Sequence, residues 1–132
     1  LKTIKYFNDF AVFCGNGALA LYTSRRGGAG AITGDANISA KLLSFIIHNF
    51  KREKEVKNFT ELQALMESIR NVLSSHEQIS LLKAYFSVAD KIEDWNKVIP
   101  PLKRIENPSN NKQVTALLDL IPQIEKLVPS GS

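Results

Sequence analysis

The sequence has 132 residues, of which 44% are hydrophobic and 23% are charged, and its formal net charge is +4. This length and composition exclude a disordered chain and predict one domain with a core of its own. The positive charges are spread along the chain and the longest apolar run, residues 42–50, is too short to cross a bilayer, so we expect neither nucleic acid nor a membrane as partner.

The first third of the chain predicts two short strands joined by a helix. The apolar run 11–14 is stopped by Gly15, which is typical of a strand buried on both faces. Residues 18–26 contain helix formers, and Gly27 after them is suited to the left-handed conformation that ends a helix. The run 28–34 then predicts a second buried strand, whose small residues indicate that another backbone or a ligand comes close.

The chain from Ser39 onward has the periodicity of amphipathic helices. Thr60 is the predicted N-cap of the second of these helices, and Pro122 is expected to kink or divide the last one. A proline-rich connector, residues 98–111, precedes that last helix. The apolar stripes contain, in chain order, Leu42, Leu43, Ile46, Ile47 and Phe50; Leu62, Leu65, Met66, Ile69, Val72 and Leu73; Leu81, Leu82, Tyr85, Phe86 and Ala89; and Val114, Leu117, Leu118, Ile121 and Ile124.

Two parallel strands with one connecting helix do not make a complete sheet, because parallel sheets need further strands and cover on both faces. The sequence offers no third strand. Either another chain completes the sheet or these residues belong to a larger fold, and we favour the larger fold. The first residue is Leu1 rather than methionine, which also points to a processed or partial chain.

Six of the seven glycines lie between Gly15 and Gly34, and three functional readings of this block fail. A phosphate-binding loop needs a lysine and a hydroxyl residue after its last glycine, whereas Asp35 follows Gly34. The dinucleotide-binding pattern fails because Thr33 stands where the third glycine belongs. The Arg-Gly-Gly sequence of residues 26–28 occurs once, whereas RNA-binding tags of this kind come as repeats.

Few side chains stand out as candidates for chemistry. A single cysteine, Cys14, excludes an intramolecular disulfide framework and favours a reducing, cytoplasmic location. Cys14 is either a small buried hydrophobic residue or an active-site group at the carboxyl end of a strand. His48 and His76 have no second ligand at metal-binding spacing, so we expect no metal. Lys83 is expected to be a surface lysine rather than a Schiff-base amine.

Asp35 is the acid of most interest, because it directly follows the second predicted strand. It either caps the helix that begins near Ser39 or contacts a substrate. The sequence leaves both roles open.

Residues 10–43, FAVFCGNGALALYTSRRGGAGAITGDANISAKLL, resemble the seventh and eighth strand–helix units of the dihydrodipicolinate synthase / N-acetylneuraminate lyase family. The resemblance is carried by Gly15, by the glycines of residues 27–30, by the strand 31–33 and by the Ala-Asn pair 36–37. The later segments LLKAYFSVADKI and PPLKRI are similar to the helical C-terminal appendage of that family.

The resemblance implies an α/β fold, the C-terminal portion of a (β/α)₈ TIM barrel. Residues 1–56 would form the last strand–helix units and residues 57–132 the C-terminal helical region. It also implies part of a lyase that forms a Schiff base between pyruvate, or another 2-oxo acid, and a lysine on strand six. That lysine would precede Leu1, and neither Lys2, Lys5 nor Lys83 matches its position. The chain's partners would be the rest of the barrel and further copies in a homo-oligomer, for which a tetramer is one option. The resemblance implies no cofactor. A role in lysine biosynthesis is a further option.

Two residues match substrate-binding positions of the family. Gly15 matches the glycine that lets pyruvate approach strand seven, and Ile32 matches the strand-eight residue that faces the keto acid; Asp35 is a further candidate for substrate contact. The chain lacks the acidic pair that holds sugar hydroxyls in sialic-acid lyases, because Gly17 and Ala18 stand in those places. The resemblance therefore leaves a synthase and another 2-oxo-acid aldolase or dehydratase equally open.

Two alternatives from other functional classes remain. Residues 39–128 would then be a helical protein-interaction module with a glycine-rich arm, or the chain would belong to a catalytically inactive barrel relative with a regulatory role.

Overall fold

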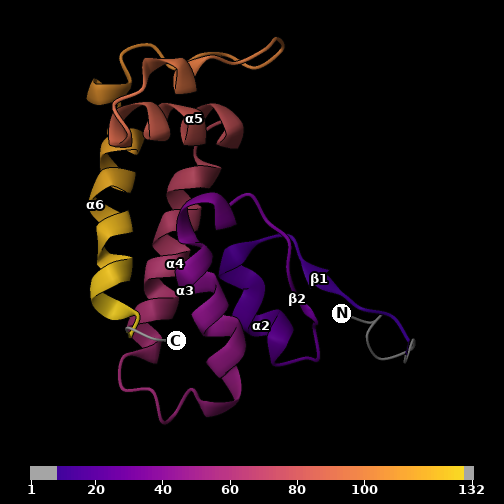
Figure 1. The fold of residues 1–132 in the computed structure, drawn as a ribbon. Helices are drawn as coiled ribbons and strands as arrows, with labels where there is room; N and C mark the ends of the chain where they lie inside the picture. Colours follow the sequence, from indigo (N-terminus) through magenta and orange to yellow (C-terminus); the bar gives the residue numbers. More distant parts are fainter. Residues whose placement is uncertain (1–8, 130–132) are drawn as a thin grey trace.

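The computed structural model describes residues 9–129, in which helices predominate and two short strands lie at one side (Figure 1). The elements in chain order are β1 (Phe13–Cys14), η1 (Gly17–Leu19), α2 (Ala20–Ser24), β2 (Gly30–Ala31), α3 (Ala36–Asn49), η2 (Phe50–Arg52), α4 (Phe59–Ser74), α5 (Gln78–Ala89), η3 (Glu93–Asn96), η4 (Pro108–Asn110) and α6 (Lys112–Leu127).

Strands β1 and β2 are parallel neighbours, with Phe13 paired to Gly30 and Cys14 to Ala31. The strands are shorter than predicted, with two residues each, and the Phe13 side chain is 50% exposed in the described part of the chain. Their burial on both faces within a larger fold stays a prediction. Helix α2 packs against both strands. In the described part of the chain the sheet has these two strands alone, so each strand keeps one edge without a strand partner.

The predicted end of helix α2 is confirmed. Gly27 adopts a left-handed conformation with φ of 83°, and its backbone N–H donates to Ser24 O at 3.1 Å. The N–H of Gly28 donates to Thr23 O at 3.0 Å, which completes the paired hydrogen bonds of a Schellman motif. The guanidinium of Arg26 lies 3.6 Å from the centre of the Tyr22 ring. The Arg-Gly-Gly sequence is therefore a helix terminus, stabilised by a cation–π contact.

We expect Gly28→Ala to lower the free energy of unfolding by about 1–3 kcal/mol, because overpacking a filled site costs that much. A Cβ atom at Gly28 would lie 2.4 Å from Thr23 Cγ2 and 3.0 Å from Thr23 O. The matched control is Gly15→Ala, since a Cβ atom at Gly15 meets nothing within 4 Å. Urea unfolding of the full-length protein measures both, and equal losses from the two variants would contradict the packing argument.

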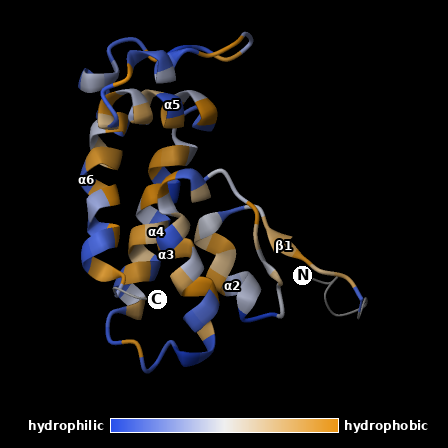
Figure 2. Ribbon diagram, viewed as in Figure 1, coloured by the Kyte–Doolittle hydropathy of each residue, from blue (hydrophilic) through white to orange (hydrophobic). Residues whose placement is uncertain are grey.

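Helices α3, α4 and α6 stand side by side, and α5 lies across one end of them (Figure 1). Helix α4 packs most extensively against α6, and the Asn58 side chain ties their ends by donating to Leu127 O at 2.8 Å. The apolar faces of the helices turn inward, whereas β1 is an apolar segment at the periphery (Figure 2). The residues with no exposed surface include Leu42, Ile46, Leu62, Met66, Ile69, Leu73, Leu81, Val114 and Leu117.

This hydrophobic core is continuous across the predicted boundary between residues 56 and 57, since Leu42 and Ile46 on one side belong to the same cluster as Leu62 and Leu117 on the other. The structure contains one shared core rather than two separate ones. The division into a barrel part and a helical region stays a prediction.

Two predicted helix starts are displaced. Helix α4 begins at Phe59, after Asn58, rather than after an N-cap at Thr60. Helix α3 begins at Ala36, before Ser39, and Ser39 itself has non-helical angles (φ −135°, ψ 21°) that kink the helix. The Ser39 hydroxyl donates to Asp35 O at 2.7 Å, so the side chain satisfies a carbonyl at the kink.

Of the two effects predicted for Pro122, a kink or a division of the last helix, the division does not occur, because α6 continues through it. Pro122 is exposed, and Leu117 and Ile124 on either side of it are buried in the core and hold both halves of the helix in place. The N-terminus of α6 is fixed by Asn111, whose side chain accepts from the N–H groups of Gln113 and Val114 at 3.0 and 3.1 Å.

Candidate site at the carboxyl ends of the two strands

The carboxyl ends of β1 and β2 lie side by side because the strands are parallel. The N–H of Ile32 donates to Cys14 O at 2.9 Å, one step beyond the last paired residues. This bond brings Ile32 next to Gly15. The two residues predicted to bind substrate are thus neighbours at one edge of the sheet, where active-site groups collect in (β/α)₈ barrels.

This edge is open and apolar. Gly15 is exposed and has free space where a side chain would be, and Ile32 is 73% exposed. Leu19, at the end of the short turn η1, is 52% exposed. We refer to Gly15, Leu19 and Ile32 as the strand-end surface.

The turn after β1 is held by local hydrogen bonds. The Asn16 side chain accepts from Ala18 N at 3.0 Å, and the Cys14 thiol donates to Asn16 O at 2.9 Å. Cys14 is 8% exposed, in agreement with its interpretation as a small buried residue. The thiol therefore supports the turn from inside.

Asp35 lies directly behind the strand-end surface and has no exposed surface. Its Oδ2 accepts from Gly17 N at 2.7 Å, and its Oδ1 accepts from Arg70 Nη1 at 2.8 Å and from Gln78 Nε2 at 2.9 Å. The capping prediction is wrong in its chemistry: Asp35 stands at the N-cap position of α3, but its side chain makes no capping hydrogen bond. Both oxygens face other elements, which leaves neither free for a substrate in this conformation.

The partners of Asp35 were not found by sequence reasoning. Arg70 lies on α4 and Gln78 at the start of α5, 35 and 43 residues away in the chain. A buried aspartate needs a cation and donors, so the sequence signals that partners exist, but nothing in a single sequence identifies them.

The other candidates lie away from this site. Lys83 lies on α5, and its ammonium is 5.7 Å from the centre of the Trp95 ring in η3. This position agrees with a surface role. His48 bonds to Ser44 O within its own helix at 2.8 Å, and His76 is exposed. Lys2 and Lys5 lie outside the described residues.

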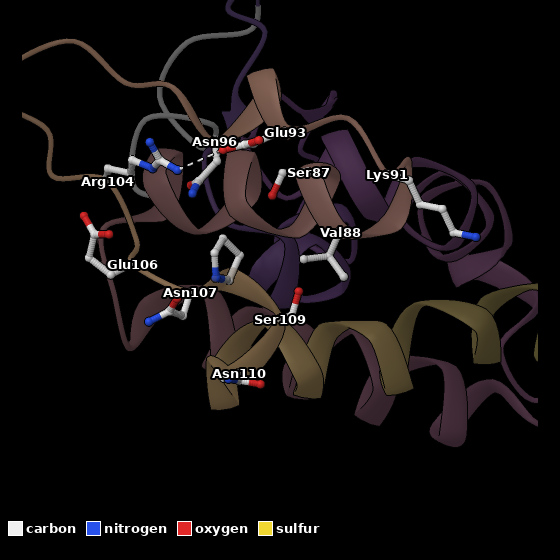
Figure 3. A pocket seen from close by; sticks show the side chains of 11 residues that line it. Ser87, Val88, Lys91, Glu93, Asn96, Arg104, Glu106, Asn107, Ser109 and Asn110 are labelled. Carbon is white, nitrogen blue, oxygen red and sulfur yellow. Dashed lines mark ion pairs between the residues drawn. The ribbon is translucent and has the colours of Figure 1, made fainter.

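A hollow of about 520 Å³ lies away from the strand ends. The end of α5, the turns η3 and η4 and residues 104–107 surround it (Figure 3). Its wall carries an ion pair between Arg104 and Glu93, 3.6 Å apart, and the buried amide of Asn96, which donates to Ile105 O at 2.9 Å. These residues belong to the C-terminal helical region and none comes from the strand ends.

Burial, with a smaller contribution from the charge of Asp90, raises the pKa of the Tyr85 phenol above its ordinary value. Tyr85 lies on α5 in the hydrophobic core, so the shift reflects packing there rather than the strand-end surface.

Within residues 9–129, no three His, Cys, Asp or Glu side chains lie close enough to hold a metal ion. The same residues include no helix that is long and apolar enough to cross a membrane.

Comparisons with known proteins agree on one family. Residues 1–120 match the model of the dihydrodipicolinate synthetase family. A solved structure, described as the first monomeric dihydrodipicolinate synthase variant, matches with a TM-score of 0.72 at 20% sequence identity. The match covers 95% of this chain and 39% of that one, so the fold described above corresponds to about two fifths of that protein. No curated protein sequence matches significantly.

Proposed function

Because the chain belongs to the dihydrodipicolinate synthetase family, we propose that it forms the last two strand–helix units of a (β/α)₈ barrel lyase and the helical region that follows them. The proposed reaction makes or breaks a carbon–carbon bond of pyruvate or another 2-oxo acid through a Schiff base. Gly15 and Ile32 are the proposed substrate-binding residues.

The exposed apolar surface of the strands supports the barrel part of the proposal. Phe13 is 50% exposed, and each strand has an edge without a strand partner in the described chain. Further parallel strands beside β1 and β2 would satisfy these edges and cover Phe13. We propose the rest of the barrel as their partner.

The observation that carries the proposed site is the hydrogen bond from Ile32 N to Cys14 O. It sets Gly15 and Ile32 side by side at the carboxyl edge, where a (β/α)₈ barrel binds its substrate. Because Gly15 has no side chain, there is room for a small acid close to its backbone. Ile32 offers an apolar wall beside it.

The chemistry follows from the Schiff base. A lysine amine and the keto carbonyl lose water to form an iminium at C2 of the 2-oxo acid. When the C3–C4 bond breaks, its electron pair forms the C2=C3 bond of an enamine, and the hydroxyl on C4 loses its proton as the other fragment leaves as an aldehyde; bond formation is the reverse. The family resemblance puts this lysine on strand six, before Leu1, so the residues of this chain shape the pocket rather than supply the nucleophile. Lys83, held against Trp95, has no part in the proposed step.

The strand-end surface favours a substrate without sugar hydroxyls. Gly17 and Ala18 provide no carboxylates there, and both oxygens of Asp35 are engaged by protein donors. We therefore propose a 2-oxo acid whose remaining part is small or apolar, since the exposed side chains of the strand-end surface, Leu19 and Ile32, are hydrocarbon.

The test is borohydride reduction of the full-length protein in the presence of pyruvate, followed by peptide mass analysis. We expect one covalent adduct, on a lysine that lies outside this chain, because reduction fixes the iminium as a stable amine. The control variant Lys83→Ala is expected to form the adduct as well as the unmodified protein. No adduct with pyruvate or any other 2-oxo acid would contradict the proposal and favour the inactive barrel relative.

The helical interaction module is less well supported. The apolar stripes that it would offer to a partner are buried against one another, including Leu62, Ile69 and Leu117, each with no exposed surface.

A further inference from the structure

We propose that Asp35 is a positioning residue, which holds the strand-end surface in shape by tying the turn after β1 and the start of α3 to helices α4 and α5. The part of this inference that concerns catalysis rests on the proposed function. The structural part does not.

Three donors from three separate parts of the chain converge on the Asp35 carboxylate. They are the backbone N–H of Gly17 at 2.7 Å, Arg70 Nη1 at 2.8 Å and Gln78 Nε2 at 2.9 Å. Asp35 has no exposed surface, and the Arg70 side chain is 23% exposed. The buried negative charge is thus offset by a partly buried positive one and by two neutral donors.

This arrangement resists displacement. A buried carboxylate without hydrogen-bond partners is strongly destabilised, because nothing replaces its lost contacts with water. Each of the three donors therefore stabilises the buried position of Asp35. Arg70 Nε is buried with no hydrogen-bond partner, which makes the guanidinium dependent on its bond to Asp35. The two ionised groups therefore hold each other in place.

Two glycines make the cluster geometrically feasible. A Cβ atom at Gly17 would lie 2.7 Å from Asp35 Oδ2 and 2.6 Å from Met66 Cε, so any side chain there would push the carboxylate away. A Cβ atom at Gly34 would lie 2.7 Å from Gln78 Nε2. Glycine at both places lets the carboxylate approach the turn and lets Gln78 approach the carboxylate.

The cluster acts on the strand-end surface at close range. Gly17 is two residues after Gly15, and Asp35 is three residues after Ile32. A single carboxylate thus fixes both turns from behind, while the surface itself remains free for a ligand. The helices that supply Arg70 and Gln78 become part of the support of the site.

The closing experiment compares Asp35→Asn with Asp119→Asn, an exposed aspartate on α6, in the full-length protein. The amide keeps the shape of Asp35 but removes its charge and weakens its bond to the Gly17 N–H. We expect hydrogen exchange at the Gly17 amide to become about 10-fold faster or more in Asp35→Asn, because bonds to charged groups are the stronger ones. Exchange at Ile69 in the core reports any loss of global stability, so the Gly17 rate is measured at a temperature where both variants are fully folded and Gly17 exchanges by local opening.

The second measurement is the apparent KM for pyruvate, taken as the concentration that gives half of the maximal borohydride-trapped adduct. We expect Asp35→Asn to raise this apparent KM about 10-fold, because small misplacements at a binding surface are costly, and Asp119→Asn to leave it unchanged. Should Asp35→Asn fail to fold, Gln78→Met replaces it: this variant removes one neutral donor, keeps the pair with Arg70, and should shift both readouts by about 3-fold in the same direction.

The outcomes separate the two proposals. If the unmodified protein forms no pyruvate adduct, the proposed function fails and the Gly17 exchange rate alone decides the positioning role. Wild-type exchange at Gly17 in the variants overturns the inference. So does a wild-type KM in an adduct-forming enzyme, which would leave Asp35 a role in stability alone.

Discussion

Replacing Ile69 with alanine is expected to lower the free energy of unfolding by about 2–5 kcal/mol, the range for removing a large aliphatic side chain from a packed core. Ile69 lies in the middle of α4 and has no exposed surface. It belongs to the cluster shared by the helices α3 to α6, so the cavity would open where the helices meet. Urea unfolding of the full-length protein, followed by circular dichroism, measures the loss.

The matched control is Ile79→Ala on α5, where the same atoms are removed from a side chain that is 56% exposed. We expect a change within about 0.5 kcal/mol, as for most surface substitutions. A similar loss at both positions would mean that the helices do not share the core described here.

Replacing Gly15 with valine is expected to reduce the rate of pyruvate adduct formation by about 100-fold, the effect of a misplacement of about 1 Å at a reacting centre. The added side chain would enter the free space beside Ile32 that we assign to the substrate. Borohydride trapping under single-turnover conditions measures the rate.

Stability provides the internal control for this variant. A Cβ atom at Gly15 has no neighbour within 4 Å, so we expect the urea midpoint to change little. Gly15→Ala should lie between wild type and valine in rate. An unchanged rate in Gly15→Val would show that the substrate does not approach this glycine, whereas a loss of folding would show that the space is filled in the complete protein.

Local sequence signals predicted part of this fold well. Gly27 ends α2 in the left-handed conformation, because glycine adopts a positive φ angle without steric strain. The few residues at the end of the helix are enough to predict this. The stripes of α4 and α6 repeat over several turns, which identified Leu62, Ile69 and Leu117 as core residues.

The errors share a different cause. The strands were expected to be longer, but their extent depends on neighbouring strands rather than on their own residues. Pro122 was expected to kink or divide α6, but the helix is not divided, because packing on both sides of Pro122 outweighs its local cost. Helix starts at Ala36 and Phe59 were misplaced because neither has a side-chain cap to mark it.

For the site, the family resemblance selected Gly15 and Ile32, and the structure sets them side by side at the carboxyl ends of the parallel strands; their role in substrate binding stays a prediction. The sequence did not predict that Asp35 faces inward. The orientation of the Asp35 side chain is set by Arg70 and Gln78. These partners lie 35 and 43 residues away in the chain, so the sequence around Asp35 does not reveal them.

The contacts of Asp35 bear on how relatives of this chain can be recombined. Chimeric proteins are made by joining the sequence of one homologue to that of another at a chosen position. A junction placed after α3 in this chain would separate the Asp35 carboxylate from its partners Arg70 and Gln78. Chimeras that exchange Arg70 and Gln78 together with Gly17, Gly34 and Asp35 keep these contacts intact.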